Sequence, residues 1–299
     1  MFPEAPSRAV PPPTGSPSAA RLRRIALLLF ALTASLRATP LSFSVRSSAH
    51  WHDNVTNADR APDERAALET NHEFSAGHRW TAGRHLGVAV AGRALAESWP
   101  RYDGLDRAAL GLALSAQKKT GFGPNATVFG AALSGDRFFA RETGRAGLAG
   151  SAEVFVRHRF ASWAQLRLSR EYLRYDARAH AFDRTSRDTR LRLSGDFAGR
   201  WTAAATVARR DGGVLSYARP PHPQLLRQGK ALTTVSTFDA DLPFVAYYFI
   251  ARTYAVRAEL SRVLPHRSNL TLAVERRLTS EGVVDYRNHV VSLHFAHAF

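Results

Sequence analysis

The segment that decides the fold is the last one, Tyr286–Phe299, which reads YRNHVVSLHFAHAF. Apolar and polar side chains alternate along it. One parity carries Val291, Leu293, Phe295 and Phe299, and the other carries Asn288, Ser292 and His294. Successive side chains of a β-strand point to opposite faces. The segment therefore predicts an amphipathic strand whose final residue is a phenylalanine.

The same alternation recurs along most of the chain after residue 40, and helical periodicity is nearly absent. We assign twelve segments, each close to the length of a tilted membrane strand with its rims. They are Leu41–Asp53, Ala66–Trp80, Leu86–Trp99, Arg107–Lys118, Thr127–Phe138, Ala146–Phe160, Trp163–Tyr175, Thr189–Phe197, Trp201–Arg210, Val245–Leu264, Leu270–Thr279 and Tyr286–Phe299. An all-β fold follows.

The connections between these segments differ in length. Every second connection is a short turn, and several of these turns contain Gly, Pro or Asn. The short ones are Thr81–His85, Lys119–Ala126, Ala161–Ser162, Ala198–Arg200 and Pro265–Asn269. Among the others, Asp176–Asp188 and Asp211–Phe244 are long and polar. Strand counts of ten or fourteen also fit, because Asp211–Phe244 could contain a hairpin around Leu232–Phe238.

The N-terminal segment has the features of an export signal. Residues Ile25–Ala34 form a short apolar run that follows Arg21, Arg23 and Arg24, which is the layout of a secretory signal peptide. We expect an N-terminal extension and signal peptide over residues 1–38, with cleavage near Ser35–Ala38, and one folded domain over residues 39–299.

The net charge of +16 raises the question of nucleic-acid binding. Residues 1–40 contain five arginines and one glutamate, so +4 of that charge belongs to the N-terminal segment and +12 remains. A nucleic-acid binder gathers its charge on one helix or patch, whereas here arginines are distributed along the strands with carboxylates nearby. We expect no nucleic-acid partner, and the absence of cysteine excludes disulfides and thiolate chemistry.

An alternating terminal strand that ends in Phe299, short turns opposite long loops, and an export signal resemble the bacterial outer-membrane β-barrel superfamily. This resemblance implies a transmembrane antiparallel up-and-down β-barrel of about twelve strands, located in the outer membrane. Closure leaves no unpaired sheet edge in lipid. The resemblance also implies that Phe299, Phe295 and Leu293 form the insertion signal read by the barrel-assembly machinery. Outer-membrane lipid and lipopolysaccharide are the surroundings we expect.

The aromatic residues fit this arrangement. Trp51, Trp80, Trp99, Trp163 and Trp201 all fall near the ends of predicted strands, where the interface between membrane and water favours amphipathic rings. Tyr247, Tyr248 and Phe249 are expected to reinforce the outer aromatic girdle.

The alternation also separates a lipid face from a lumen face. Leu191 and Leu193, for example, are predicted to point outward, while Arg190 and Arg192 point inward. The candidate lumen-lining residues are Arg157, Arg159, Arg167, Arg190, Arg192, Arg257, Arg277, Glu153, Glu171, Glu259 and Glu275. Arg170, Arg252 and Arg276 fall on the outward phase.

Three interpretations of function remain open. The inward arginines and carboxylates could line a passive or substrate-preferring channel for small polar solutes, with Asp211–Phe244 as a lid or constriction. They could instead fill the lumen of a structural or interaction barrel that acts through its surface loops on a surface or secreted protein. Trp51-His52-Asp53-Asn54-Val55 is weakly similar to barrels that export surface lipoproteins.

The third interpretation is an esterase. Ser292 and His294 lie two residues apart with Asn288 on the same face, an arrangement similar to that of outer-membrane phospholipases. Ser48, His50 and His52 repeat the spacing on the first strand. Those phospholipases place the pair toward lipid, whereas the phase here puts both sets inside. The histidines could also bind a metal, but we expect polar strand positions, with no catalytic residue, metal or cofactor.

Overall fold

The computed structural model of the protein describes residues 37–38, 40–82, 85–239, 241, 243–282 and 284–299. The chain divides into two compact units, Met1–Arg37 and Ala38–Phe299, and the second contains the barrel. The signal peptide expected within residues 1–38 falls almost entirely outside the described residues, so it stays a prediction.

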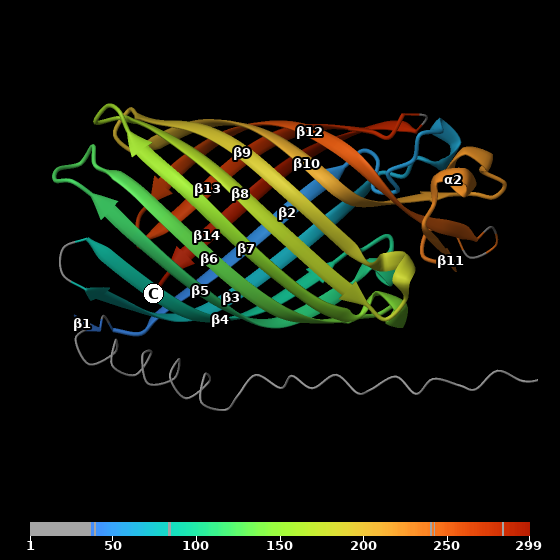
Figure 1. The fold of residues 1–299 in the computed structure, drawn as a ribbon, viewed down its shortest axis with the longest axis horizontal. Coiled ribbons are helices and arrows are strands. Elements are labelled where there is room, and N and C mark those ends of the chain that lie inside the picture. Colours follow the sequence, from blue (N-terminus) through green and yellow to red (C-terminus); the bar gives the residue numbers. More distant parts are fainter. Residues whose placement is uncertain (1–36, 39, 83–84, 240, 242, 283) are drawn as a thin grey trace, which may run out of the picture. The chain divides into compact units, whose positions relative to one another are not determined.

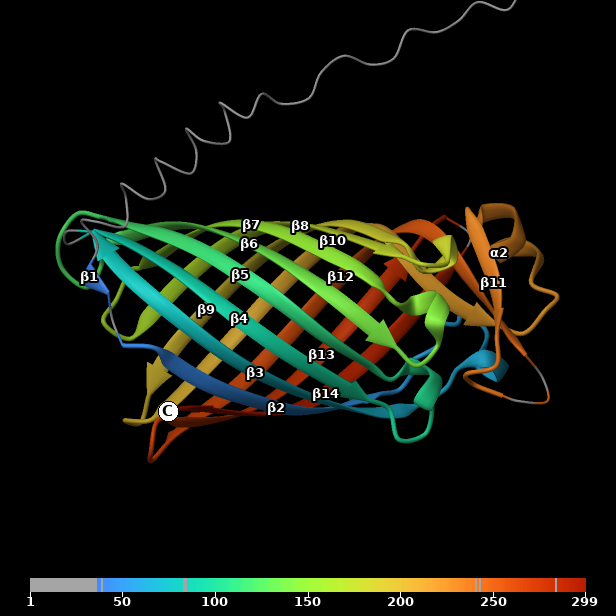
Figure 2. The same cartoon turned by 90° about the horizontal axis from the view of Figure 1, so that it is seen from below.

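Residues 38–299 form a closed antiparallel β-barrel (Figures 1 and 2). Twelve strands of the described chain make up its wall: β2 (Ser42–His52), β3 (Ala67–Ala82), β4 (Leu86–Ser98), β5 (Arg107–Thr120), β6 (Thr127–Ala140), β7 (Gly147–Arg159), β8 (Ala164–Ala177), β9 (Arg184–Phe197), β10 (Trp201–Ala218), β12 (Phe244–Leu264), β13 (Ser268–Ser280) and β14 (Asp285–Ala298). The last strand pairs with the first, with Ser292 opposite His50, and this pairing closes the sheet. The predicted fold class and strand number are confirmed.

The connections at one rim of the barrel are short turns and those at the other rim are longer loops, as the sequence predicts. Short turns join the strands at the rim where β2 begins and β14 ends, for example residues 198–200 between β9 and β10. At the other rim the connections contain one-turn helices, namely η1 (Ala61–Asp63), η2 (Asp103–Leu105), η3 (Thr143–Arg145) and η4 (His180–Phe182). Because outer-membrane barrels have short periplasmic turns and longer extracellular loops, we take this loop-bearing rim as the extracellular one.

The longest extracellular connection, residues 219–243, contains α2 (Pro223–Gln228) and β11 (Ala231–Val235). Strand β11 pairs with the outer end of β12, from Phe244 to Tyr248, and so forms a hairpin outside the barrel wall. The hairpin considered around Leu232–Phe238 therefore exists, but it adds no strand to the barrel. A further two-residue strand, β1 (Arg37–Ala38), also lies outside the wall.

Two predicted loops proved too long. Strand β9 begins at Arg184 rather than Thr189, and β10 continues to Ala218 rather than ending at Arg210. The ends of β10 and β12 extend beyond the other strands at the extracellular rim, where Ala218 pairs with Val245 (Figure 1). Gly213 permits this extension, because a Cβ atom there would lie 2.4 Å from the ring of Tyr248.

The outer face of the barrel is a belt of exposed aliphatic and aromatic side chains. Leu110 and Leu112 are 61% and 66% exposed, and neighbouring strands contribute Leu133, Val154 and Val256 to the same belt. No described helix has the length and apolarity to cross a membrane. An apolar belt of this extent on a closed sheet is stable only against lipid.

The terminal residues Leu293, Phe295 and Phe299 also lie on this exposed outer face, and the Phe299 amide donates to the Phe43 carbonyl oxygen over 3.0 Å. Their role as an insertion signal stays a prediction. Arg170, in the middle of β8, and Arg276, in the extracellular half of β13, also point outward. An arginine that faces lipid at the bilayer midplane costs about 2–4 kcal/mol, so these two positions are unfavourable for the barrel in a membrane.

Candidate functional site

A cavity of about 540 Å³ lies inside the barrel against strands β7 to β10, β12 and β13. Its wall consists almost entirely of charged, hydroxyl and alanine side chains. They are Glu153, Arg167, Ser169, Asp188, Arg190, Arg192, Thr206, Ala208, Arg210, Thr253, Ala255, Arg257, Glu259, Glu275 and Arg277. Six guanidinium groups therefore face four carboxylates around one space.

Strand register brings these charges together. In β9, Asp188, Arg190 and Arg192 occupy successive inward positions, and the outward positions between them are Thr189 and Leu191. Arg192 is directly opposite Arg167 of β8 on one side and Thr206 of β10 on the other. Like charges directly opposite each other repel, so each guanidinium needs a carboxylate from elsewhere.

Those carboxylates form a ladder of ion pairs in separate groups along the wall. Arg167 contacts Glu153 over 2.9 Å. Arg190 contacts Glu171 over 2.8 Å and Asp188 over 2.9 Å, and Arg210 contacts the same Asp188 over 2.7 Å.

A second part of the ladder lies on β12 and β13. Arg257 contacts Glu259 over 2.7 Å and Glu275 over 3.4 Å, while Arg192 also pairs with Glu259 and Arg277 with Glu275. Most carboxylates of the ladder form ion pairs with two arginines each. The ladder thus satisfies the acids and leaves an excess of positive charge facing the cavity.

The structure places most of the sequence-predicted lumen residues around this cavity. Glu171 joins the ladder through Arg190. Two others lie nearer the periplasmic end: Arg157 lines a separate space of about 200 Å³, and Arg159 lies 3.8 Å from Asp196. Asp188 also lines the lumen, although it falls within the predicted loop Asp176–Asp188; the inward series through Arg190 and Arg192 extends back to it.

The part of the lumen beside β6 and β7 is filled by larger side chains. The inward-pointing ring of Phe155 lies over Gly130, where a Cβ atom would be 2.2 Å from that ring. Arg167 in turn lies over the Phe155 ring, 4.1 Å from its centroid. An aromatic side chain and a guanidinium therefore occupy this side.

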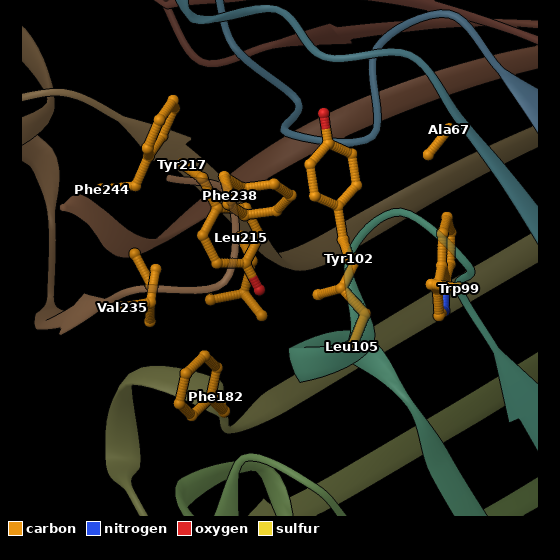
Figure 3. Packing of buried hydrophobic residues seen from close by; sticks show 11 residues of the cluster. Ala67, Trp99, Tyr102, Leu105, Phe182, Leu215, Tyr217, Val235, Phe238 and Phe244 are labelled. Carbon is orange, nitrogen blue, oxygen red and sulfur yellow. The ribbon is translucent and has the colours of Figure 1, made fainter. Parts of the chain in front are cut away.

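An aromatic cluster, defined here as the mouth cluster, packs at the extracellular end of the barrel (Figure 3). It contains Ala67, Trp99, Tyr102, Leu105, Phe182, Leu215, Tyr217, Val235, Phe238, Phe244 and Ala246. Phe238 is central, with ring centroids of Tyr217, Tyr102 and Phe244 at 4.9, 5.1 and 5.4 Å. The cluster connects the 219–243 loop with loops from strands on other sides of the barrel.

Polar contacts hold the same loops together. The Thr237 hydroxyl donates to Glu142 over 3.1 Å, and Arg145 donates to the Tyr217 hydroxyl over 3.2 Å. Burial raises the pKa of the Glu142 carboxyl, and Arg145 together with the Thr237 hydrogen bond opposes that increase. The 219–243 loop is thus fastened to the loops at 99–106 and 141–146.

Two aromatic predictions need correction. Trp99 lies buried in the mouth cluster rather than at a lipid interface. Tyr247 and Phe249 do not reinforce the outer girdle, because both are buried beneath α2 with Leu225, Val284 and other residues. Strand alternation could not reveal this packing, since it depends on a loop that folds back over the end of β12.

The serine and histidine residues of the first and last strands come together inside the barrel. His50 Nδ1 lies 2.8 Å from the Ser292 hydroxyl, and His50 Nε2 lies 2.8 Å from the Ser48 hydroxyl. His294 Nε2 lies 3.1 Å from an Arg257 nitrogen. Asn288 donates to the Asn54 carbonyl oxygen instead of orienting a histidine.

This cluster has the geometry of a structural network. Ser292 is only 2% exposed and faces the lumen, away from lipid. Both ring nitrogens of His50 are engaged by hydroxyl groups, so no carboxylate or amide orients that ring as a base would require. Among the described residues, no group of three or more potential ligand side chains is arranged to hold a metal ion.

The Asp53-Asn54-Val55 segment also has a structural role. Asn54 is buried, donates to the Ala58 carbonyl oxygen over 2.8 Å, and accepts from the Thr56 hydroxyl and the Ala58 amide, each over 3.0 Å. These bonds shape the first extracellular loop. The motif resembling surface-lipoprotein exporters is therefore accounted for by loop formation.

Comparisons with known proteins bear on the fold. No family model and no curated protein matches the sequence. An outer-membrane channel from Pseudomonas putida F1 is similar with a TM-score of 0.56 at 10% identity, over 87% of this chain and 95% of that chain. The KdgM porin with disordered oligogalacturonate gives 0.46 at 8% identity over 86% and 99% of the two chains. The CymD monoaromatic hydrocarbon channel gives 0.45 at 10% identity over 87% and 88%.

The fold argument rests on the first of these structures, and it agrees with the closed sheet and the apolar belt described above. Twelve antiparallel strands, short turns at one rim, extracellular loops at the other and a lipid-facing exterior are the features of one class of protein. The chain has the fold of a bacterial outer-membrane β-barrel.

Proposed function

We propose that the protein is a passive channel for small polar solutes that favours anions. The observation that carries this proposal is the 540 Å³ space inside the barrel, whose wall holds six arginines and four carboxylates. A solute on this path would meet guanidinium groups that replace part of its hydration, and an excess of one sign of charge favours ions of the other sign.

The lid is the second part of the proposal. The mouth cluster and the Thr237–Glu142 hydrogen bond hold the 219–243 loop at the extracellular end. Such a loop would restrict entry to the charged space, and its release would widen the path. The sequence indicated the longer segment Asp211–Phe244 as the lid or constriction. We propose that residues 219–243 have that role.

The test of selectivity uses Asp188, which pairs with Arg190 and Arg210 at the cavity wall. Asp188→Asn removes one negative charge from the path, so the reversal potential in a salt gradient across a planar bilayer should shift toward anion selectivity. Asp196→Asn is the matched control, because Asp196 is 56% exposed and 3.8 Å from Arg159, away from the cavity. Equal shifts in both variants, or cation selectivity of the wild type, would contradict the proposed path.

The second candidate is a plugged barrel that acts through its surface loops on another protein, and the mouth cluster is the observation that favours it. It would give no conductance with or without the loop. The inward, buried Ser292 and the doubly engaged His50 give the esterase interpretation no support. We therefore expect that His294→Ala does not change the hydrolysis of detergent-dispersed lipid measured with the wild type.

A further inference from the structure

The outward faces of β8, β9, β10 and β12 carry arginines in the halves of the strands that lie nearer the extracellular loops. We define the arginine patch as Arg174, Arg187, Arg209 and Arg252, together with Asp211. All of these face away from the lumen. Immediately below them, toward the middle of the wall, the same faces carry Leu168, Leu191, Val207 and Val256. The patch thus marks the upper boundary of the apolar belt.

Strand register aligns the patch across the wall. Asp211 of β10 is directly opposite Arg187 of β9 and also directly opposite Arg252 of β12. Arg187 is opposite Tyr172 of β8, and Arg209 is opposite Tyr254 of β12. Tyrosine rings therefore flank the guanidinium groups, as expected for side chains at the level of lipid headgroups.

The patch contains more positive charge than its acids neutralise. Asp211 accepts from Arg209 Nε over 2.8 Å and from Arg252 Nε over 2.9 Å, so one carboxylate serves two cations. Arg174 has its own partner, Asp176, at 2.9 Å. Arg187 has no ion-pair partner among the described residues. The outward faces of β2, β3 and β4 carry no arginine or lysine over their described lengths. Single outward arginines also occur on other strands, at Arg137 of β6, Arg276 of β13 and Arg287 of β14, but the four of the patch lie together.

A concave site adjoins the patch. A space of about 630 Å³ on the outer surface is lined by Asp211, Arg252 and Tyr254 of the wall, by Gln228 of α2, and by Glu281 of the loop between β13 and β14, among others. The Gln228 Oε1 and Glu281 Oε2 atoms are buried and have no hydrogen-bond partner among the described residues. Neither atom is accessible from the site, and Gln228 Nε2 donates to the Glu281 carbonyl oxygen over 3.3 Å, so these two residues form part of its floor.

We propose that the arginine patch and the adjoining concave site bind the phosphorylated sugar headgroup of a glycolipid of the outer leaflet, lipopolysaccharide. Guanidinium groups bind phosphate oxygens in a bidentate manner and are preferred for that role. The concave site of about 630 Å³ beside Arg252 gives room for the sugar rings of such a headgroup, which a simple phospholipid headgroup lacks. The proposal does not depend on whether the lumen conducts.

The test uses the full chain purified in detergent, with native mass spectrometry of complexes formed with bisphosphorylated lipopolysaccharide. The double variant Arg187→Ala/Arg252→Ala should lose binding at least about 10-fold, since it removes two charge-assisted phosphate contacts. The double variant Arg187→Lys/Arg252→Lys keeps both positive charges and should retain part of the binding. Arg262→Ala is the matched control: Arg262 faces outward on the same strand, β12, at the periplasmic end, where it lies over Trp201. Heat-modifiability on gels shows that each variant is folded.

Two further arms identify the ligand. Dephosphorylated lipopolysaccharide and phosphatidylglycerol should both bind more weakly than the bisphosphorylated form. Inorganic phosphate at millimolar concentration should compete poorly, because it lacks the sugar and the acyl chains. The proposal would be overturned if Arg262→Ala lost as much lipopolysaccharide binding as the double alanine variant. It would also be overturned if the dephosphorylated and bisphosphorylated forms bound equally well, or if inorganic phosphate competed fully.

Discussion

At the scale of single residues, ion pairs are used differently in the lumen and in the loops. In the lumen most carboxylates of the ladder are shared and line an open space, as Asp188 does between Arg190 and Arg210. In the loops, buried carboxylates act as anchors. The Asp63 side chain is 3% exposed and accepts from Arg60 over 2.6 Å and from Arg219 over 2.9 Å. It therefore ties the 53–66 loop to the start of the 219–243 loop.

The Asp63 anchor predicts a pH dependence. Burial alone would raise the pKa of the Asp63 carboxyl, but the hydrogen bonds from Arg219 and Arg60 outweigh it and hold the pKa below its ordinary value. A carboxyl with a lowered folded-state pKa contributes stability above its unfolded pKa of about 3.9, and this is lost as the pH falls through the folded value. The loops should therefore stay closed from pH 7 to pH 5 and loosen only below about pH 4.

Nicking by pepsin at pH 3 and at pH 5 measures this loosening. Asp63→Asn, which removes on the order of 1–3 kcal/mol of charge-assisted hydrogen bonding, should be nicked at both values. Asp103→Asn is the control, because the Asp103–Arg141 pair is well exposed and contributes little. Identical nicking of wild type and Asp63→Asn at pH 5 would show that the anchor does not hold the loops.

At the scale of elements, the amino-acid pattern predicted the strands because lipid and lumen impose opposite polarity on alternate side chains. It failed where that contrast fades. Outward positions at headgroup level accept polar side chains, as at Thr185 and Arg187, so the alternation predicts a start of β9 at Thr189 that is too late. Asp211, Gly212 and Gly213 have the composition of a turn, yet they continue β10 opposite β12. Register and loop packing depend on distant partners, so the mouth cluster left no signal in the local pattern.

The lid supplies the prediction at this scale. Phe238→Ala removes the central ring of the mouth cluster, and large-to-small changes in packed clusters typically cost about 3–5 kcal/mol. We expect the 219–243 loop to detach more often, so single-channel recordings should show longer or larger open events. Leu232→Ala is the matched control in the same loop, since Leu232 is 55% exposed on β11. If the two variants behave alike, Phe238 does not hold the lid.

At the scale of the whole molecule, closure of the sheet determines both surfaces. The pairing of β14 with β2 removes the last free edges and encloses the charged space, while the same alternation produces the apolar belt. The sequence could predict that the lumen is charged, but not that the charges gather on β7 to β13 around one cavity. That placement follows from register, which fixes Arg192 opposite Arg167 and Glu153 opposite Glu171.

The most direct test of the account is single-channel conductance in a planar bilayer, measured on the full-length protein and on a loop-replaced form. Because Ala218 pairs with Val245, residues 219–244 can be replaced by a two-residue Asn-Gly turn without changing the barrel wall. We predict steady, anion-preferring steps for the wild type and a larger conductance with the same sign of reversal potential for the loop-replaced form. No steps from either protein, each shown to be folded, would contradict a channel and favour the plugged barrel.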